Sequence, residues 1–228
     1  VGVFVPIILA VIIFSSSESF LTSENILNVF RNTSFVFITA IGMTLLIIAG
    51  GLDLSIGSVY AFAGVFAGLM MTSGVPVALS IIIVTIVSGV LFGGINGIFD
   101  EKIKLHTIIS NMETINIARG VVTGVQKGVP VYPLPASFAA IGQGSFFKRT
   151  PFEVPYVVII AVVLGLIAMF VIKKTVYGRM IFAVGGNKET ARLAGIPTRL
   201  MSFSAYILVS MLAAFSGILI SSRLGSAQ

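Results

Sequence analysis

The segment Ala40–Gly64, AIGMTLLIIAGGLDLSIGSVYAFAG, joins two strongly apolar runs through the polar interruption GGLDLSIGS at Gly50–Ser58. Each apolar run has the composition of a helix buried in a membrane. Paired glycines weaken a helix, and Asp53 or Ser55 can cap the helix that restarts near Ile56. A membrane tolerates a broken helix only where the irregular backbone is buried in protein or lines a cavity. The segment therefore predicts a helical membrane bundle that contains a break.

The composition of the whole chain also indicates a membrane protein. Of its 228 residues, 57% are hydrophobic and 10% are charged, whereas soluble domains carry roughly 45–50% apolar and about 25% charged residues. The mean hydropathy is +1.10. The net charge of +6 could suit a nucleic-acid binder, but the basic residues lie mostly in gaps between apolar runs, as in a polytopic membrane protein. These values exclude a soluble enzyme, a nucleic-acid module and a disordered tail.

The residue types that thiol and metal chemistry require are scarce. The sequence has no cysteine, which excludes disulfides, thiolate catalysis and thiol-bound metals. Its single histidine has no neighbouring cluster of carboxylates, so we expect no metal site. An intramembrane enzyme would need a nucleophile and a base on facing helices, and the sequence offers poor candidates for both. We therefore expect no catalytic residue.

Seven segments are apolar enough to form spanning or half-spanning helices. They are residues 1–14, 26–49, 56–72, 76–99, 107–125, 154–172 and 200–221. The hydrocarbon core is roughly 30 Å thick and needs about 20 helical residues, so the first segment is expected to be a helix whose start is missing. Since the chain also stops without a closing element, we expect a single membrane domain over residues 1–228 that is incomplete at both ends.

Lysine and arginine set the expected orientation. The connector 173–199 is rich in both residues, whereas the similarly long stretch 126–153 carries far fewer. Basic loops concentrate on the cytoplasmic side, so we expect 173–199 to face the cytoplasm. The prolines of 126–153 predict an irregular or re-entrant excursion on the outside. Counting the spans then places 100–106 inside and 15–25 outside.

The segment 107–125, TIISNMETINIARGVVTGV, is the least apolar of the expected spans. At about 100° per residue, Ser110, Glu113 and Asn116 share one arc, and Arg119 lies about one step from Asn116. Ionisable groups inside a membrane normally face a bundle interior or a water-filled cavity, and this arc would suit a hydroxylated substrate. Alternatively, the two charged groups pair with other helices or extend to the membrane surface.

The break around Asp53 also has two interpretations. Asp53 and Ser55 can belong to a polar translocation path, together with the arc on 107–125. Alternatively, the break is a turn on the cytoplasmic side, and Asp53 is an ordinary helix N-cap. One carboxylate does not decide its own depth in the membrane, so both interpretations stay open.

Glycines spaced four residues apart recur along the expected helices. They are Gly64 and Gly68, then Gly89, Gly93 and Gly97, and finally Gly120, Gly124 and Gly128. Such spacing places glycines on one helix face and lets a neighbouring backbone approach closely. It predicts tight helix packing and no particular function.

The stretch Tyr177–Pro197, YGRMIFAVGGNKETARLAGIP, predicts a short helix outside the membrane. Asn187 is a good N-cap, Glu189 lies in the first turn, Arg192 near the last turn, and Gly195 directly after the C-cap. A helix of seven or eight residues buries little on its own. We therefore expect it to dock on a partner, with a solvated loop helix as the alternative.

Further motifs accompany these two segments. They are FLTSENILNVFRNTS (Phe20–Ser34), INGIF (Ile95–Phe99), TINIARG (Thr114–Gly120) and AYILVSMLAAFSGILISSRLGSAQ (Ala205–Gln228). Together, over nearly the whole chain and in the same order, the motifs resemble the permease subunits of bacterial ABC importers for ribose, arabinose, xylose and related sugars. The resemblance implies an all-α polytopic membrane bundle with broken or re-entrant helices, of the ABC importer permease type, in the bacterial cytoplasmic membrane.

The resemblance also implies a function and partners. A permease of this family translocates a monosaccharide, such as a ribose-like pentose, and is not an enzyme. It is expected to bind no cofactor itself, since no Walker motif GxxxxGK[ST] occurs, and a cytoplasmic ATP-binding subunit would use the ATP. The other implied partners are an external solute-binding protein, a second permease chain (identical or paralogous) and the lipid bilayer, but no nucleic acid. The stretch of about 177–199 would be the loop that couples to the ATP-binding subunit, through Gly185, Gly186, Asn187, Lys188, Glu189, Arg192, Leu193 and Gly195.

Other transport functions remain possible at this stage. A nucleoside, autoinducer furanone or branched-chain amino-acid permease would share the architecture, although GGLDLSIGS favours the sugar type. An ion-coupled secondary transporter could use Asp53, Glu113 and Arg119 as a relay. Such transporters commonly show inverted repeats with a broken helix in each half, and only one candidate break is visible.

Overall fold

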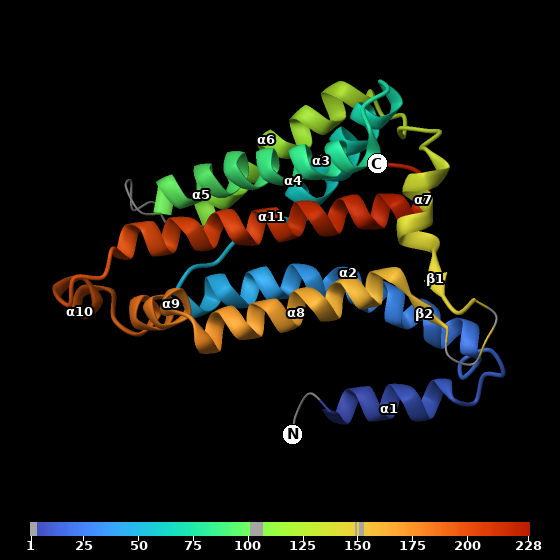
Figure 1. The fold of residues 1–228 in the computed structure, drawn as a ribbon, viewed down its shortest axis with the longest axis horizontal. Coiled ribbons are helices and arrows are strands. Elements are labelled where there is room, and N and C mark those ends of the chain that lie inside the picture. Colours follow the sequence, from blue (N-terminus) through green and yellow to red (C-terminus); the bar gives the residue numbers. More distant parts are fainter. Residues whose placement is uncertain (1–3, 101–106, 149, 151–152) are drawn as a thin grey trace.

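The computed structural model describes residues 4–100, 107–148, 150 and 153–228, and Figure 1 shows them as a bundle of helices. The α-helices are α1 (Phe4–Phe14), α2 (Ser23–Ile48), α3 (Ile56–Thr72), α4 (Val77–Ser88), α5 (Gly94–Ile98), α6 (Thr107–Gln126), α7 (Ala136–Gln143), α8 (Tyr156–Lys174), α9 (Val176–Gly186), α10 (Lys188–Leu193) and α11 (Thr198–Leu224). A π-helical segment, η1 (Gly89–Gly93), joins α4 to α5. The strands β1 (Ser145–Phe146) and β2 (Val154–Pro155) pair antiparallel. The all-α fold class is confirmed.

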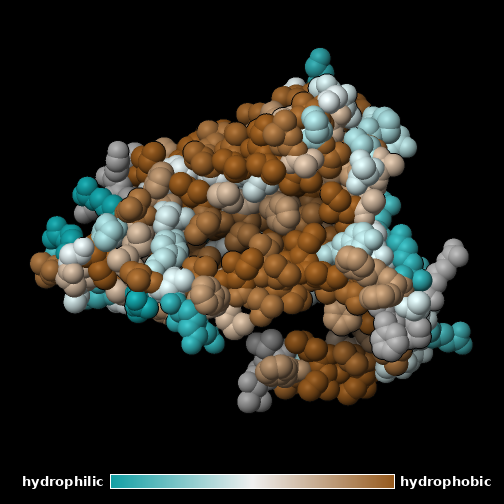
Figure 2. Space-filling view, viewed as in Figure 1, coloured by the Kyte–Doolittle hydropathy of each residue, from teal (hydrophilic) through white to brown (hydrophobic). Residues whose placement is uncertain are grey.

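The bundle has the dimensions and surface of a membrane protein. Four described helices are long and apolar enough to cross a membrane, namely Ser23–Ile48, Val77–Ile98, Tyr156–Lys174 and Thr198–Leu224. Figure 2 shows hydrophobic residues over the middle of the visible face and hydrophilic residues gathered toward its two ends. Each segment expected to be a span contains a helix at that place. Helix α6 is not one of the four, because its composition is more polar.

Helix α11 is the centre of the bundle, and it packs against α2, α3, η1 and α7. Small residues allow this close packing. A side chain on Gly217 would overlap the Tyr60 carbonyl of α3, and one on Gly93 would overlap the Tyr206 carbonyl of α11. The first two groups of spaced glycines therefore pack tightly, mainly against α11. The third group, Gly120, Gly124 and Gly128, has open space over its Cα atoms within the described chain.

The predicted break is confirmed at its expected position. Helix α2 ends at Ile48, α3 begins at Ile56, and Gly50 takes a φ of +85°, a left-handed conformation that favours glycine. The π-helical segment η1 is a second irregularity that the sequence did not predict. It lies where Gly93 meets the backbone of α11, so this contact is available only with η1 in place.

The two long connectors lie at opposite ends of the bundle (Figure 1). Helices α9 and α10 occupy one end, and α7 crosses the other end, where it contacts α11. There the Ser222 hydroxyl donates to the Phe138 carbonyl and accepts from the Gly142 amide. Opposite placement agrees with the predicted topology, whereas the side that each end faces stays a prediction. Of the predicted inner connector 100–106, residues 101–106 lie outside the described residues.

An ionic cluster joins three elements at the α7 end. Arg31 on α2 contacts the Glu153 carboxylate at 3.5 Å, and both side chains are largely buried. The Asn28 amide oxygen accepts from Arg31 at 3.4 Å and from Arg223 of α11 at 3.3 Å. The two guanidinium groups thus meet at one oxygen, with a carboxylate beside them.

We expect Glu153→Ala to lower the melting temperature of the detergent-solubilised protein. The change leaves two neighbouring, partly buried cations without this carboxylate, which should cost about 1–3 kcal/mol, between the values for exposed and buried pairs. Glu18→Ala is the matched control, because Glu18 is exposed. Equal melting temperatures for the two variants would show that the cluster does not stabilise this end.

Candidate functional site

The break between α2 and α3 is held by Asp53, whose side chain is buried at 1% exposure. Its Oδ1 atom accepts hydrogen bonds from the Ser55 amide at 2.8 Å and the Ser55 hydroxyl at 2.6 Å. Ser55 is the N-cap residue of α3, but its side chain makes no capping bond to the helix. The expectation that Asp53 or Ser55 would cap the helix is therefore wrong. Asp53 instead closes a turn immediately before α3.

Two residues that the sequence analysis did not single out complete this turn. The Asn96 amide of α5 donates to Asp53 Oδ1 at 3.2 Å and to Ser55 Oγ at 2.9 Å. Its oxygen accepts from the hydroxyl of Thr114 on α6 at 2.5 Å. Asn96 lies in INGIF and Thr114 in TINIARG, and a polar residue inside an apolar segment is the signal that could have revealed them. Three separate motifs thus meet in one buried network.

Further buried polar groups surround the break. The Asn111 amide donates to the Leu52 carbonyl at 3.0 Å, and Ser210 and Tyr206 of α11 lie close to the Asp53 carboxyl. We call this set the break cluster: Asp53, Ser55, Asn96, Asn111, Thr114, Tyr206 and Ser210. No group of three or more histidine, cysteine or acidic side chains suited to a metal ion occurs in the part of the chain that the structure describes. The cluster is a hydrogen-bonding site.

The predicted arc on α6 is divided by the structure. Ser110 is 2% exposed, whereas Glu113, Asn116 and Arg119 are all exposed. Helix α6 packs on α3 and buries the face that carries Ser110, Asn111, Thr114, Ala118 and Val122. The inward face is therefore rotated from the predicted arc, and only Ser110 lies on it. The other three side chains form an outer polar face.

The short helix predicted at 187–195 is confirmed as α10. The Asn187 side chain caps it by accepting from the Thr190 amide at 2.9 Å. At the other end Gly195 has a φ of +81°, its amide donates to the Arg192 carbonyl at 3.0 Å, and the Ile196 amide donates to the Ala191 carbonyl at 3.1 Å. These two bonds form a Schellman motif. Local sequence alone thus defines a rigid, separately capped helix.

The outer surface of α10 is charged and apolar. Glu189 and Arg192 pair at 2.6 Å with both side chains exposed, and the guanidinium group lowers the pKa of the Glu189 carboxyl. Leu193 is 79% exposed, whereas Ala191 is buried against the bundle. A fully exposed leucine beside an ion pair is a surface that suits a protein partner.

The loop before α10 contacts the break directly. A side chain on Gly185 would overlap the Ile48 carbonyl oxygen at the end of α2, whereas Gly186 has open space around it. A Cβ placed on Gly50 would lie 3.7 Å from the Gly185 Cα atom. Helix α9 and the start of the break are therefore in backbone contact.

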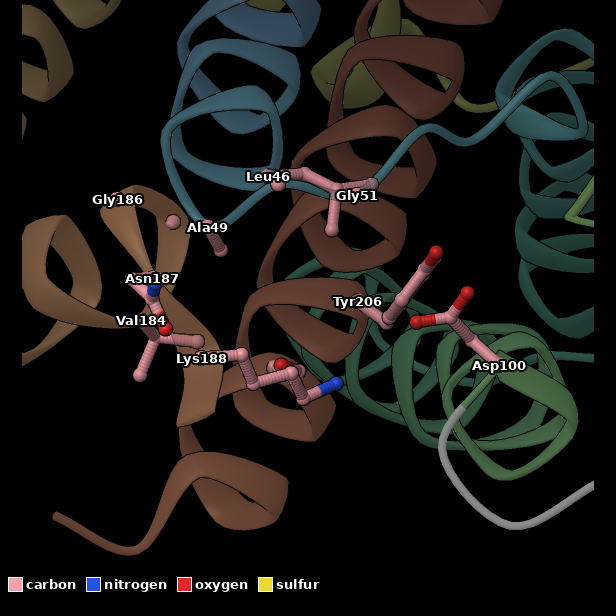
Figure 3. Close-up of a pocket in the computed structure, with 12 residues that line it drawn as sticks. Leu46, Ala49, Gly51, Asp100, Val184, Gly186, Asn187, Lys188 and Tyr206 are labelled. Carbon is pink, nitrogen blue, oxygen red and sulfur yellow. The ribbon is translucent and has the colours of Figure 1, made fainter. Parts of the chain in front are cut away.

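A cavity of about 220 Å³ lies between this loop and the break. Figure 3 shows Lys188 and Asp100 extending into it from opposite walls, with Tyr206 beside Asp100. The lining residues are Leu46, Ala49, Gly50, Gly51, Asp100, Val184, Gly185, Gly186, Asn187, Lys188, Ser202 and Tyr206. The cavity therefore brings most of the loop residues named from the sequence next to the break. Glu189, Arg192, Leu193 and Gly195 lie outside it.

Comparison with known proteins identifies the family. Residues 25–228 match the family described as branched-chain amino acid transport system / permease component. The chain belongs to this permease family. The permease is 34% identical over 226 residues to the ribose import permease of Haemophilus influenzae, covering 97% of this chain and 68% of that protein. It is thus a multi-pass membrane protein, and the family resemblance noted in the sequence is confirmed.

Two further relatives of the permease are named for other sugars. The D-allose transport system permease of Escherichia coli K12 is 30% identical over 229 residues, covering 100% of this chain and 69% of that protein. The L-arabinose ABC transporter permease of Azospirillum brasilense is 29% identical over 209 residues, covering 90% and 59%. No solved structure matches the permease significantly.

Proposed function

We propose that this permease is the membrane-spanning subunit of an ATP-binding-cassette importer that carries a monosaccharide across the bacterial cytoplasmic membrane. The observation that carries the proposal is the junction between α10 and the break. An exposed, rigidly capped helix adjoins, through Gly185, the segment where the buried polar cluster begins. The names of the relatives support a ribose-like sugar as substrate.

The outer face of α6 supplies a path for such a substrate. Glu113, Asn116 and Arg119 are exposed, and a charged side chain facing lipid at the bilayer centre costs about 2.5–3.5 kcal/mol. A water-filled path between this chain and a second permease chain would remove that cost. Carboxylate, amide and guanidinium groups also bond sugar hydroxyls well. The open surface over Gly120 and Gly124 lets the second chain approach closely.

The two ends of the bundle would serve different partners. A cytoplasmic ATP-binding subunit would dock on α10 and supply all ATP hydrolysis, with the permease binding no cofactor. Because α10 and α9 are short rigid helices, nucleotide-driven closure would reach the bundle as a rigid-body movement. An external solute-binding protein would deliver the sugar at the α7 end.

Purification and transport together test this function. Gentle extraction of the tagged full-length protein, followed by mass spectrometry, should recover an ATP-binding subunit. Vesicles holding the complex should take up radiolabelled ribose, allose or arabinose only with ATP and the solute-binding protein. Leucine is the critical competitor, since the family description names branched-chain amino acids. Uptake of leucine without sugar would overturn the substrate, and gradient-driven uptake by the chain alone would overturn the importer mechanism.

We expect Arg192→Glu to weaken docking of the ATP-binding subunit. The change replaces the ion pair on exposed α10 with two neighbouring carboxylates, so recovery of the subunit should fall roughly five- to tenfold, a loss of about 1–1.4 kcal/mol. The bundle should stay folded, because both side chains are exposed. Lys148→Glu, an equal charge reversal at the opposite end, is the control. Equal recovery with both variants would rule out α10 as the docking surface.

A further inference from the structure

The cavity beside α10 and the break cluster are separated by one aromatic side chain, Tyr206. Tyr206 lines the cavity, yet its residue is 0% exposed. Its hydroxyl group lies close to the Leu52 backbone and to both Asp53 and Asp100. We propose that Tyr206 is the gating side chain that closes the translocation path between the cavity and the break cluster. This inference rests on the proposed transport function.

Unpartnered oxygens indicate that the far side of Tyr206 holds water. Asp53 Oδ2, Asn111 Oδ1, Ser210 Oγ and the Tyr206 hydroxyl are all buried, with no hydrogen-bond partner among the described residues. A buried polar atom left unpaired costs about 1–3 kcal/mol, and ordered water commonly satisfies such atoms. Four of them around one break therefore mark a small hydrated site inside the bundle.

The near side of Tyr206 is polar as well. Asp100 at the end of α5 and Lys188 at the start of α10 reach into the cavity from opposite walls (Figure 3). Ser202, one turn before Tyr206 on α11, also lines it. A polar cavity on one side and unpartnered polar oxygens on the other leave the tyrosine ring as the barrier between them.

The position of the cavity links this barrier to α10. Its walls include the last residues of α9, Gly185 and Gly186, and the first residue of α10, Lys188. A rigid movement of α9 and α10 changes the width of the cavity. The contact of Gly185 with the Ile48 carbonyl carries the same movement to the start of the break. Movement of the docked helix therefore acts on both sides of Tyr206.

Cysteine accessibility tests the proposal without requiring transport. The chain contains no natural cysteine, so Ser210→Cys introduces a single, nearly isosteric probe on the break-cluster side. In inside-out vesicles, an impermeant maleimide should label this cysteine slowly. Adding Tyr206→Ala should raise the labelling rate about tenfold, because removing the ring leaves a cavity in a close-packed wall. Adding Tyr206→Phe should leave the rate low, since the ring remains.

Two controls keep the result decisive. Ser80→Cys on α4 is equally buried at 0% exposure, and it should stay unlabelled beside Tyr206→Ala unless the bundle unfolds. Where the alanine variant does not fold, Tyr206→Leu should give the same rise. Equal labelling of Ser210→Cys with and without the ring would overturn the gate. Because labelling needs no ATP-binding subunit, a missing gate is distinguishable from a failed uptake assay.

Discussion

Gly185→Ala is expected to reduce ATP-driven sugar uptake by more than about tenfold, because the new methyl group strikes backbone and not a movable side chain. Its Cβ would overlap the Ile48 carbonyl oxygen at the end of α2. No rotamer change relieves that overlap, so α9 must move away from the break. The loop that bears α10 would then lose its direct contact with the segment it is proposed to move.

The matched control for this variant is Gly57→Ala. Gly57 lies in the first turn of α3, on the other side of the break, and nothing lies within 4 Å of its added Cβ. Alanine favours a helix over glycine by roughly 0.5–1 kcal/mol, so this variant should express and transport like the parent. Uptake should be compared at equal membrane expression, with recovery of the ATP-binding subunit measured in parallel. Normal uptake by Gly185→Ala would mean that the backbone contact has no part in coupling.

The second large effect is expected for Asn96→Ala. The Asn96 side chain bonds Asp53 and Ser55 through its amide and accepts from Thr114 through its oxygen. Alanine leaves the Thr114 hydroxyl and part of the Asp53 carboxylate without these partners in a buried site, at a cost of roughly 2–4 kcal/mol. The melting temperature in detergent should fall by several degrees, and uptake should fall with it.

Asn32→Ala provides the comparison, because Asn32 is exposed on α2. Its removal should leave the melting temperature unchanged. Asn96→Asp is a sharper version of the test, since it places a second carboxylate against Asp53 at a buried position. It should destabilise the protein at least as much as alanine does. If both Asn96 variants melt with the parent, the network does not hold the break.

The elements predicted most accurately are those defined by neighbouring residues. Asn187, Glu189, Arg192 and Gly195 lie within one short segment, and every capping bond of α10 is made inside or directly beside that segment. The break at Gly50–Ser58 was predictable for the same reason, because paired glycines end a helix whatever surrounds them. Apolar length alone placed the spans.

The break cluster could not be assembled from the sequence in this way. Asp53, Asn96, Thr114 and Ser210 come from four different elements, and Asp53 was assigned a capping role that Ser55 occupies without a side-chain bond. Each of these residues has an unremarkable local sequence. Only the packing of α3, α5, α6 and α11 brings them within hydrogen-bonding distance.

The sequence by itself determined that this protein is a helical membrane bundle, where its main break lies, and how α10 begins and ends. The tertiary structure alone decided which face of each helix is buried, as α6 illustrates: Ser110 turns inward while Glu113, Asn116 and Arg119 stay outside. In a soluble helix the apolar stripe identifies the buried face. In a membrane, lipid is as apolar as the protein core, so hydropathy does not reveal the inward face. Steric fit and hydrogen bonding between distant segments set the rotation of each helix instead.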